Sequence, residues 1–363
     1  MPKLLFIRYK NPPNILEGGE MGTNKNLYVL SQILGDDNVT TFNILEKNLS
    51  VVQKLCALVR LPRNFYLGMT NRKMKHILHI ANNYDFVYID RSIFGVVAQY
   101  LRRAKYKGRI ITFFHNVEYF YYLSRFAGNV FAKRILLRCI YNNDKLACQH
   151  SDKIILLNKR DNQQLQQLYG RSADIITPVV LRDRYAQHEQ DGSVLTSKIP
   201  HCMFVGSYLK ANNNGLLWFV KEVLPNVNIQ FTAVGKGLAK LQKEEQSLQN
   251  INVMSDVPDL RPYYEQADII VAPIFEGSGM KIKTCEALMY GKNILGTDEA
   301  FEGYEIDVNK IGGKCNNITD FINNITDFIN NPRPKFNNFS REMFLKHYST
   351  ESVINKFKSA LYE

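Results

Sequence analysis

Short apolar runs with the character of β-strands alternate with helical patterns along nearly the whole chain. In the first half, the strand candidates are residues 3–9, 39–44, 86–90, 109–114, 153–157 and 174–177. Such alternation is typical of βαβ units, because two consecutive parallel strands need a helical crossover between them. The pattern therefore predicts an α/β fold with a parallel sheet.

The alternation stops once and then restarts. Residues 181–200 are polar and unpatterned around 187–193, and new strand candidates follow at residues 201–205, 229–234, 251–254, 268–272 and 293–296. A chain of 363 residues also exceeds what one hydrophobic core usually organises. We predict two Rossmann-like, doubly wound domains at residues 1–182 and 200–346, joined by a linker at 183–199.

Two features near the C-terminus predict packing helices. A seven-residue duplication, at 317–323 and again at 324–330, repeats its Ile and Phe at helical spacing on one face. Within residues 347–363, Ser349 or Thr350 is a suitable helix cap, and the residues after it form an amphipathic pattern. We expect this last helix to cross back and pack toward the N-terminal domain.

Several sequence features argue for a cytoplasmic location. The apolar runs fall far short of the ~20 residues that a transmembrane helix needs. Arg8 and Lys10 interrupt the first run where the apolar core of a signal peptide would continue. The six cysteines show no C-x-x-C pairing, which fits a reducing compartment.

The net positive charge is confined to the N-terminal half. Residues 1–180 carry 26 Lys and Arg against 12 Asp and Glu, whereas the remainder carries 20 against 22. Such a basic surface suits an anionic lipid surface, a pyrophosphate-linked acceptor or nucleic acid, or it is merely a solvated face. No nucleic-acid-binding module accompanies the charge, so we expect no nucleic-acid partner.

The densest chemical signal is the segment A-P-I-F-E-G-S-G-M-K-I-K-T-C-E-A-L at residues 272–288. It follows a predicted strand and leads into a predicted helix, so Gly277 and Gly279 lie where free amides and a helix N-terminus can face an anion. This arrangement predicts a phosphate site. The alternative is an ordinary glycine turn.

Three charged residues follow these glycines. Lys281 and Lys283 add positive charge, and Lys283 and Glu286 share one face of the predicted helix. A carboxylate one turn beyond a phosphate site is well placed to accept hydrogen bonds from ribose hydroxyls. The alternative is a surface ion pair at i,i+3 spacing.

This segment resembles the donor-site motif of family 4 glycosyltransferases with the GT-B fold, in the branch that reads G-S-G-x-[KR]-x-K-x-x-E-A. F-V-G-S at 204–207, N-N-G-L at 213–216, V-G-K-G at 234–237 and V-P-D-L at 257–260 are similar to other parts of that family's donor domain. The donor-binding residues that the resemblance implies are Gly206, Lys210, Asn213, Val257, Ser278, Gly279, Met280, Lys281 and Glu286.

The resemblance extends more weakly into the N-terminal half. G-G-E-M-G-T at 18–23 resembles the family's glycine-rich acceptor-side loop, and F-H-N-V-E at 114–118 looks like its His-containing loop. The acceptor-side residues implied are Gly18, Gly19, Gly22 and Asn116. The resemblance also implies that His115 supports the sugar through a hydroxyl hydrogen bond or its backbone, although a lone His at a strand end is otherwise more often structural.

Lys283 and Glu276 complete the catalytic residues that the resemblance implies. Many family members carry two glutamates separated by seven residues, but nine residues separate Glu276 from Glu286. Aligning on Glu286 puts Ser278 at the first-glutamate position, whereas aligning on the glycine turn selects Glu276. Both alternatives stay open.

The resemblance implies a glycosyltransferase that moves a sugar from a nucleotide-diphosphate sugar to a glycan or lipid-linked acceptor, with retention of configuration. The chain contains no D-x-D motif, so we expect no metal or other cofactor. Residues 51–80 interleave apolar with basic side chains and suit an anionic membrane, as in assembly of a surface polysaccharide or glycoconjugate, or form an ordinary domain face. The alternatives are a non-catalytic sugar-nucleotide-binding or partner subunit of the same fold, and an epimerase.

Overall fold

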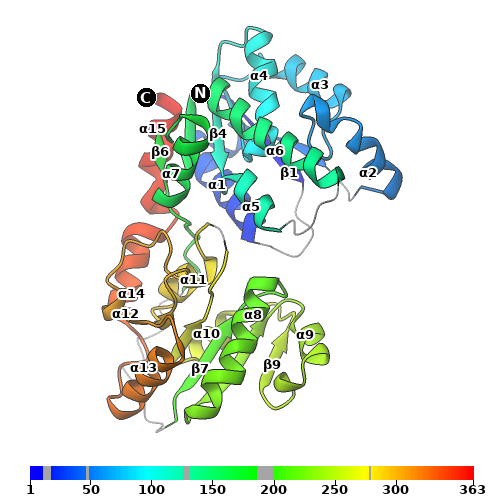
Figure 1. The fold of residues 1–363 in the computed structure, drawn as a ribbon. Coiled ribbons are helices and arrows are strands. Elements are labelled where there is room, and N and C mark those ends of the chain that lie inside the picture. Colours follow the sequence, from blue (N-terminus) through cyan, green and yellow to red (C-terminus); the bar gives the residue numbers. More distant parts are fainter. Residues whose placement is uncertain (11–17, 46–48, 126–130, 186–198, 278) are drawn as a thin grey trace. The chain divides into compact units, whose positions relative to one another are not determined.

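The computed structural model describes residues 1–10, 18–45, 49–125, 131–185, 199–277 and 279–363. The chain forms two compact units: unit 1 comprises Met1–Pro178 and Val353–Glu363, and unit 2 comprises Val179–Ser352. Each unit contains a sheet of six parallel strands with connecting helices (Figure 1). The prediction of two Rossmann-like α/β domains is confirmed. Most of the predicted linker lies outside the described residues.

The sheet of unit 1 has the order β2-β1-β3-β4-β5-β6. Its strands are β1 (Leu4–Lys10), β2 (Val39–Leu45), β3 (Phe86–Ile89), β4 (Arg109–Phe114), β5 (Lys153–Leu156) and β6 (Ile175–Ile176). Its helices are α1 (Gly18–Leu34), α2 (Val51–Leu58), α3 (Asn71–Ala81), α4 (Gly95–Arg103), α5 (Glu118–Arg125), α6 (Phe131–His150), α7 (Lys159–Tyr169) and α15 (Ile354–Tyr362). The strand order reverses between β1 and β3, and ligands of such sheets bind at the carboxyl ends of the strands where this happens.

The sheet of unit 2 has the order β12-β11-β10-β7-β8-β9. Its strands are β7 (His201–Val205), β8 (Gln230–Gly235), β9 (Asn252–Ser255), β10 (Ile269–Ala272), β11 (Asn293–Gly296) and β12 (Gly312–Lys314). Its helices are α8 (Lys210–Trp218), α9 (Leu238–Glu244), α10 (Arg261–Gln266), α11 (Ile282–Met289), α12 (Val308–Ile311), α13 (Ile318–Asn330) and α14 (Asn338–Met343). The order reverses between β7 and β10, which places the expected ligand crevice beyond Val205 and Ala272.

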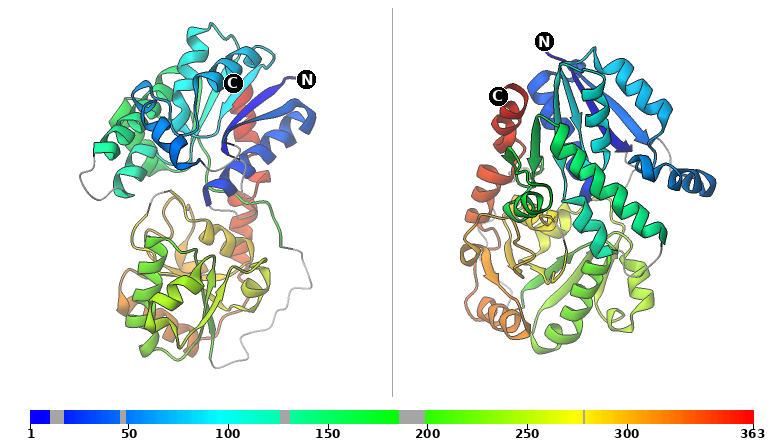
Figure 2. Two further views of the ribbon diagram at one scale, coloured as in Figure 1. Left: turned by 90° about the vertical axis from the view of Figure 1, so that its right-hand side faces the viewer. Right: turned by 45° about the horizontal axis from the view of Figure 1, so that its top comes forward.

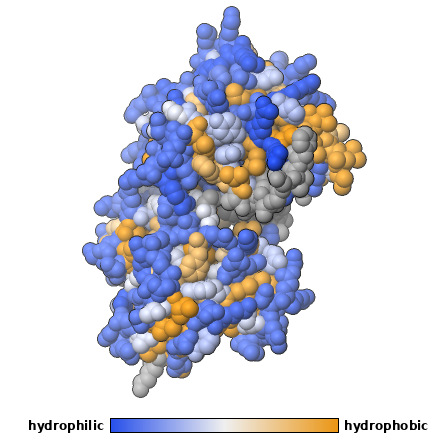
Figure 3. Space-filling model, in the orientation of Figure 1, coloured by the Kyte–Doolittle hydropathy of each residue, from blue (hydrophilic) through white to orange (hydrophobic). Residues whose placement is uncertain are grey.

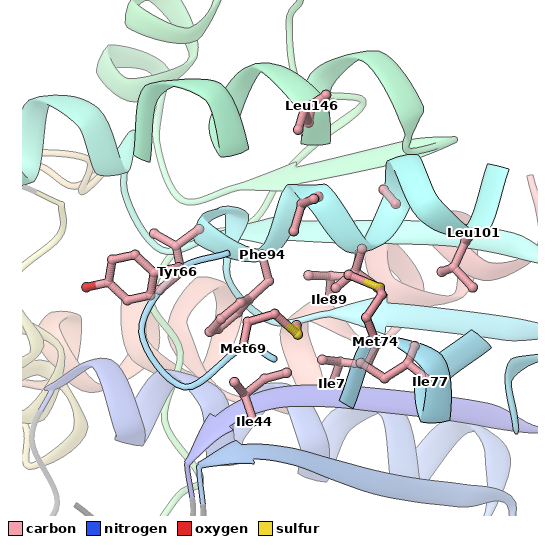
Figure 4. Close-up of a cluster of buried hydrophobic side chains, with 14 of the residues drawn as sticks. Ile7, Ile44, Tyr66, Met69, Met74, Ile77, Ile89, Phe94, Leu101 and Leu146 are labelled. Atoms are coloured by element: carbon pink, nitrogen blue, oxygen red, sulfur yellow. The ribbon is translucent and has the colours of Figure 1, made fainter. Parts of the chain in front are cut away.

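Each unit has its own apolar core. Most of the surface seen in Figure 3 is hydrophilic. In unit 1, Ile7, Ile89 and Phe94 lie in a closely packed cluster between the sheet and the helices (Figure 4). Phe204, Phe219 and Phe321 belong to the corresponding core of unit 2. The sheets are therefore rigid platforms for the residues at their strand ends.

Both predicted C-terminal helices are present. In α13, Phe321, Ile325 and Phe328 are buried and Ile318 packs against the same core, as the duplication predicts. Helix α15, the red end of the chain in Figure 2, belongs to unit 1. Its Phe357 stacks on Tyr88 of β3 with ring centroids 6.5 Å apart.

The strand predictions agree with the structure to within a residue or two, but β12 was not predicted. Its three residues, Gly-Gly-Lys, offer no apolar side chain that would mark a strand. No helix in the described part of the chain is both long and apolar enough to cross a membrane.

Candidate functional site

Two glycine turns meet at the carboxyl end of β7. The amide of Gly206 donates to the carbonyl of Val234, with an N–O distance of 3.0 Å. A Cβ atom on Gly235 would lie only 2.0 Å from the carbonyl oxygen of Gly206. The two turns, which the sequence places 29 residues apart, therefore pack backbone against backbone, and only glycine fits at Gly235.

The loop after β10 turns sharply into α11. Gly279 has φ 62°, the left-handed conformation that glycine favours, and Lys281 is the N-cap residue of α11. Lys281 Nζ donates to the carbonyl of Gly279 at 2.9 Å and to Glu299 Oε1 at 2.6 Å. The charge of Lys281 is thus already paired with a carboxylate. Ser278 lies outside the described residues.

Lys283 projects from the first turn of α11 toward the end of β7. Its Nζ donates to Asn212 Oδ1 at 2.7 Å and lies 4.8 Å from the centroid of the Phe204 ring. Burial, together with the nearby positive charge of Lys281, lowers the pKa of Lys283 to about 7. Since no carboxylate among the described residues bonds this ammonium directly, an anion that binds beside it would stabilise its charged form.

Glu286 lies one turn further along α11 and is buried. Its carboxylate accepts a hydrogen bond from the Tyr264 hydroxyl at 3.3 Å, and an Arg184 nitrogen lies 4.0 Å from its other oxygen. Burial raises the pKa of Glu286, and Arg184 and Tyr264 oppose that rise. Tyr264 in turn stacks on Tyr290 with ring centroids 4.7 Å apart, which fixes the hydroxyl that holds the carboxylate.

The remaining predicted donor residues differ in exposure. Lys210 is exposed at the first residue of α8, and Val257 is half-buried beyond β9. Asn213, also on α8, has a buried Oδ1 atom for which the described residues provide no hydrogen-bond partner. Met280 is buried, and its sulfur accepts from the amide of Val179 at 3.3 Å.

Glu276 stands apart from Glu286. It is exposed, and its Oε1 atom accepts a hydrogen bond from Asn214 Nδ2 of α8 at 3.0 Å. The two carboxylates therefore occupy different environments, one solvated and one buried. The choice between Glu276 and Ser278 as the counterpart of the family's first glutamate stays open.

In unit 1, His115 and Asp90 meet at the ends of neighbouring strands. His115 follows β4 and Asp90 follows β3, and the His115 Nε2 to Asp90 Oδ2 distance is 3.1 Å. Asn26 Nδ2 donates to Asp90 Oδ1 at 2.8 Å, and the Thr23 hydroxyl also donates to Asp90. Burial would raise the pKa of Asp90, but His115 and these hydrogen bonds outweigh it and hold the pKa below its usual value.

This network fixes the protonation state of His115. Burial, together with the positive charges of Arg91 and Lys25, lowers the pKa of His115 more than Asp90 raises it, which favours the neutral ring at pH 7. With Nε2–H donating to Asp90, the lone pair lies on Nδ1. A Cβ atom on Gly22 would lie 3.0 Å from Nδ1, so the glycine leaves space beside this acceptor atom.

The structure brings Gly22, one of the predicted acceptor-side residues, next to His115, which was predicted as a catalytic residue. Asn116 is half-buried directly after His115. Gly18 and Gly19, however, form the first turn of α1, so residues 18–23 are helical where a loop was expected. Glycines are tolerated there because the first amides of a helix have no intrahelical partner in any case. The preceding residues 11–17 lie outside the described part of the chain.

Several residues of these sites were missed as functional candidates from the sequence. Asp90 bonds His115, and Asn26 in turn bonds Asp90. Arg184, Tyr264 and Asn212 contact Lys283 or Glu286 on α11. A polar residue directly after a buried strand, as at Asp90, was the available signal. Arg184 gave none, because it lies at the start of the predicted linker.

Comparisons with known proteins identify a matching family and similar folds. Residues 199–331 match the family described as "Glycosyl transferases group 1". No curated protein matches the chain in sequence. Among solved structures, the chain is similar to HepE of Anabaena in complex with UDP-glucose, with 14% identity, a TM-score of 0.68 and 99% of both chains covered.

Two further solved structures are similar over almost their whole length. Sucrose-phosphate synthase of Thermosynechococcus elongatus has 12% identity and a TM-score of 0.72, with 99% of this chain and 98% of that chain covered. The lipopolysaccharide outer core galactosyltransferase WaaB has 14% identity and a TM-score of 0.64, with 99% of both chains covered. The chain therefore has the two-domain GT-B fold of glycosyltransferases.

Residues 199–331, which include the candidate donor-site residues of α8 and α11 described above, match the group 1 glycosyltransferase domain. The prediction of a glycosyltransferase is confirmed at this level. Membership of family 4 stays a prediction.

Proposed function

We propose that this chain transfers a sugar from a nucleotide-diphosphate sugar to a glycan or lipid-linked acceptor in the cytoplasm, at the inner face of a membrane, for a surface polysaccharide or glycoconjugate. The observation that carries the proposal is that Lys283 and Glu286 lie one turn apart on α11, at the point where the strand order of unit 2 reverses. One side chain suits a diphosphate and the other suits ribose hydroxyls.

Glycosyl transfer requires stabilisation of a departing diphosphate. Lys283 has no direct carboxylate partner in the described structure and carries a lowered pKa, so a bound diphosphate gains a charge-assisted hydrogen bond from it. A Cβ atom on Gly206 would lie 2.9 Å from the Phe204 ring and 3.0 Å from Asn212, so the glycine lets this turn pack closely against the two residues that contact Lys283. Lys281 contributes mainly by fixing the loop, because Glu299 already binds its ammonium.

Glu286 is suited to bind the donor ribose. Its carboxylate is buried and held by Tyr264, which leaves acceptor capacity for hydroxyl groups of a ligand. The HepE structures contain UDP, UDP with glucose, or UDP-glucose, and this makes UDP-sugars the first donors to test.

On the acceptor side, we propose that His115 accepts a hydrogen bond from a sugar hydroxyl through Nδ1. Asp90 fixes the ring orientation and the tautomer, as a buried carboxylate does for other functional histidines. The lowered pKa keeps His115 neutral, so it orients a hydroxyl rather than supplying a positive charge.

Retention of configuration and independence from metal ions belong to the proposal. Lys283 and the preorganised amides of the donor site would stabilise the departing diphosphate, as a cation bound by a D-x-D motif does in another class of glycosyltransferases.

A thermal-shift screen of UDP-, GDP-, ADP- and dTDP-sugars in EDTA tests the proposal, because a bound donor stabilises the folded state by mass action. We expect one nucleotide class to raise the melting temperature of the wild type. Lys283→Ala and Glu286→Ala should abolish that rise, whereas Lys221→Ala, at an exposed lysine elsewhere in unit 2, should preserve it. If no nucleotide sugar changes the melting temperature, the donor site is wrongly assigned.

A further inference from the structure

Helix α2 of unit 1 presents its apolar side chains to solvent instead of to the core. Among its eight residues only Ala57 is buried. The exposed fractions are 73% for Val51, 68% for Val52, 59% for Leu55, 38% for Leu58 and 79% for Val59, which caps the helix. Surface helices normally face their apolar residues inward, so this helix is inverted.

The exposed apolar residues form one stripe. At 3.6 residues per turn, the five side chains fall within about 120° of the helix circumference, and Ala57 lies on the opposite side. In Figure 3 a hydrophobic patch occupies the place where Figure 1 shows α2. We call these five residues, Val51, Val52, Leu55, Leu58 and Val59, the α2 stripe.

The helix is held by its own cap rather than by burial. Ser50 Oγ accepts from the amide of Gln53 at 3.3 Å, and Gln53 Oε1 accepts from the amide of Ser50 at 3.0 Å. An isolated helix of this length is marginal in water. A contact that covers the stripe would therefore stabilise the helix.

The segment that contains the stripe carries only basic charged residues. Residues 51–80 contain six Lys and Arg and no Asp or Glu. Lys54 on the helix, Arg63 after it, and Arg72 and Lys75 on α3 are exposed. An apolar stripe with basic residues around it has the composition of a membrane-surface helix.

We propose that the α2 stripe docks unit 1 onto an anionic lipid bilayer, with its apolar side chains entering the interface and the neighbouring basic residues contacting the headgroups. An all-apolar protein partner would leave the basic residues unmatched, whereas an anionic lipid surface satisfies both features. The surface stands independently of the donor site. One part of the inference rests on the function proposed above, namely that docking brings the enzyme to a lipid-linked acceptor.

Cys56 provides a local probe, since it is the one exposed cysteine among the six of the chain, all of which are described. We would attach an environment-sensitive fluorophore such as NBD to Cys56 of the full chain. Vesicles of phosphatidylcholine with 30% phosphatidylglycerol should raise and blue-shift its emission, and pure phosphatidylcholine vesicles should do so much less. Co-sedimentation of unlabelled protein gives the partition coefficient.

Replacing three stripe residues with serine, as Val52→Ser/Leu55→Ser/Val59→Ser, should reduce partitioning more than tenfold, because apolar burial is lost. Lys54→Gln/Arg63→Gln should reduce binding to anionic vesicles by roughly 25-fold, at about fivefold per basic residue. Leu345→Ser is the matched control, since Leu345 is 49% exposed but belongs to unit 2. It should leave partitioning unchanged.

Three results would overturn the inference: no vesicle binding by the wild type, undiminished binding by the stripe variant, or a wild-type dimer that becomes monomeric in the stripe variant. The last result would identify the stripe as a contact between copies. Circular dichroism verifies that the variants fold. Thermal shifts with nucleotide sugars, measured without vesicles, separate the two proposals. If the wild type binds vesicles but no nucleotide sugar raises its melting temperature, only the transferase function is refuted. If a nucleotide sugar raises the melting temperature but vesicles do not bind, only docking is refuted.

Discussion

The lowered pKa of Lys283 makes donor binding dependent on pH in a specific way. The free protein has a Lys283 pKa of about 7, because burial and Lys281 disfavour the ammonium. A bound diphosphate favours the ammonium and returns its pKa toward the ordinary lysine value of about 10.4. Binding is therefore coupled to uptake of a proton by this side chain, and the donor affinity falls as the pH rises above 7.

The size of the effect follows from the two pKa values. For a full return of the pKa, the affinity falls by nearly tenfold per pH unit above 7, and by roughly 100-fold between pH 6 and pH 9. Since Lys283 is only partly buried, solvent screening reduces this limit, and we expect a fall of at least tenfold. Proton uptake should approach one half at pH 7 and one near pH 8.5.

Isothermal titration calorimetry measures both quantities, in buffers that differ in ionisation enthalpy. The ligand should be the nucleotide sugar selected by thermal shift, because its diphosphate diester stays ionised across this range, unlike the terminal phosphate of a free nucleotide. Lys283→Met keeps the length of the side chain and removes the charge. It should weaken binding at pH 6 by roughly 10- to 100-fold, the loss of one charged hydrogen bond, and should flatten the pH profile.

Lys292→Met is the matched control. Lys292 is buried, its Nζ donates to the carbonyl of Ala267 at 3.0 Å, and burial lowers its pKa to about 7 as well. It precedes β11 and so lies at the opposite edge of the sheet from the strand ends that carry the donor site. This variant should retain the pH profile. A flat profile in the wild type, or an unchanged profile in Lys283→Met, would refute the assignment of Lys283 to the diphosphate.

Three further predictions concern other parts of the molecule. Glu286→Gln keeps a partner for Tyr264 but replaces one ribose acceptor oxygen with a donor, so calorimetry should show at least tenfold weaker donor binding with little change in melting temperature. Asp90→Ala leaves His115 and Asn26 without their buried partner, and denaturant unfolding should show a loss of about 3 kcal/mol, whereas unchanged stability would mean that the network is dispensable. Phe357→Ala, on the buried face of α15, should lower the free energy of unfolding by about 3–5 kcal/mol and make α15 sensitive to proteolysis. Unchanged resistance of α15 to proteolysis would contradict the packing role of Phe357.

Much of the fold was predictable because its signals are local. Parallel strands buried on both faces read as continuous apolar runs, and β4, β7 and β11 have the predicted bounds. The face of α13 follows from the spacing of four side chains within one helix. Where the local signal is missing, as in the Gly-Gly-Lys strand β12, only its pairing with β11 defines the element.

The proposed donor site was partly predictable for a similar reason. Gly279, Lys281, Lys283 and Glu286 lie within eight residues, so their spacing alone reveals a turn followed by a helix face. The sequence could not show that Glu299 pairs with Lys281, which leaves Lys283 for the ligand. That distinction depends on residues 18 positions apart along the chain.

The sequence by itself determined the two α/β units, the glycine turns, the last helix and the charged face of α11, because each rests on periodicity, turn chemistry or spacing over a few residues. Only the tertiary structure decided the rest. The order of strands brings Asp90 to His115, since β3 and β4 are neighbours in the sheet. Packing lowers the pKa of Lys283, and the direction in which α2 faces turns its apolar residues toward solvent. These properties depend on which elements lie next to one another, and no short stretch of sequence contains that information.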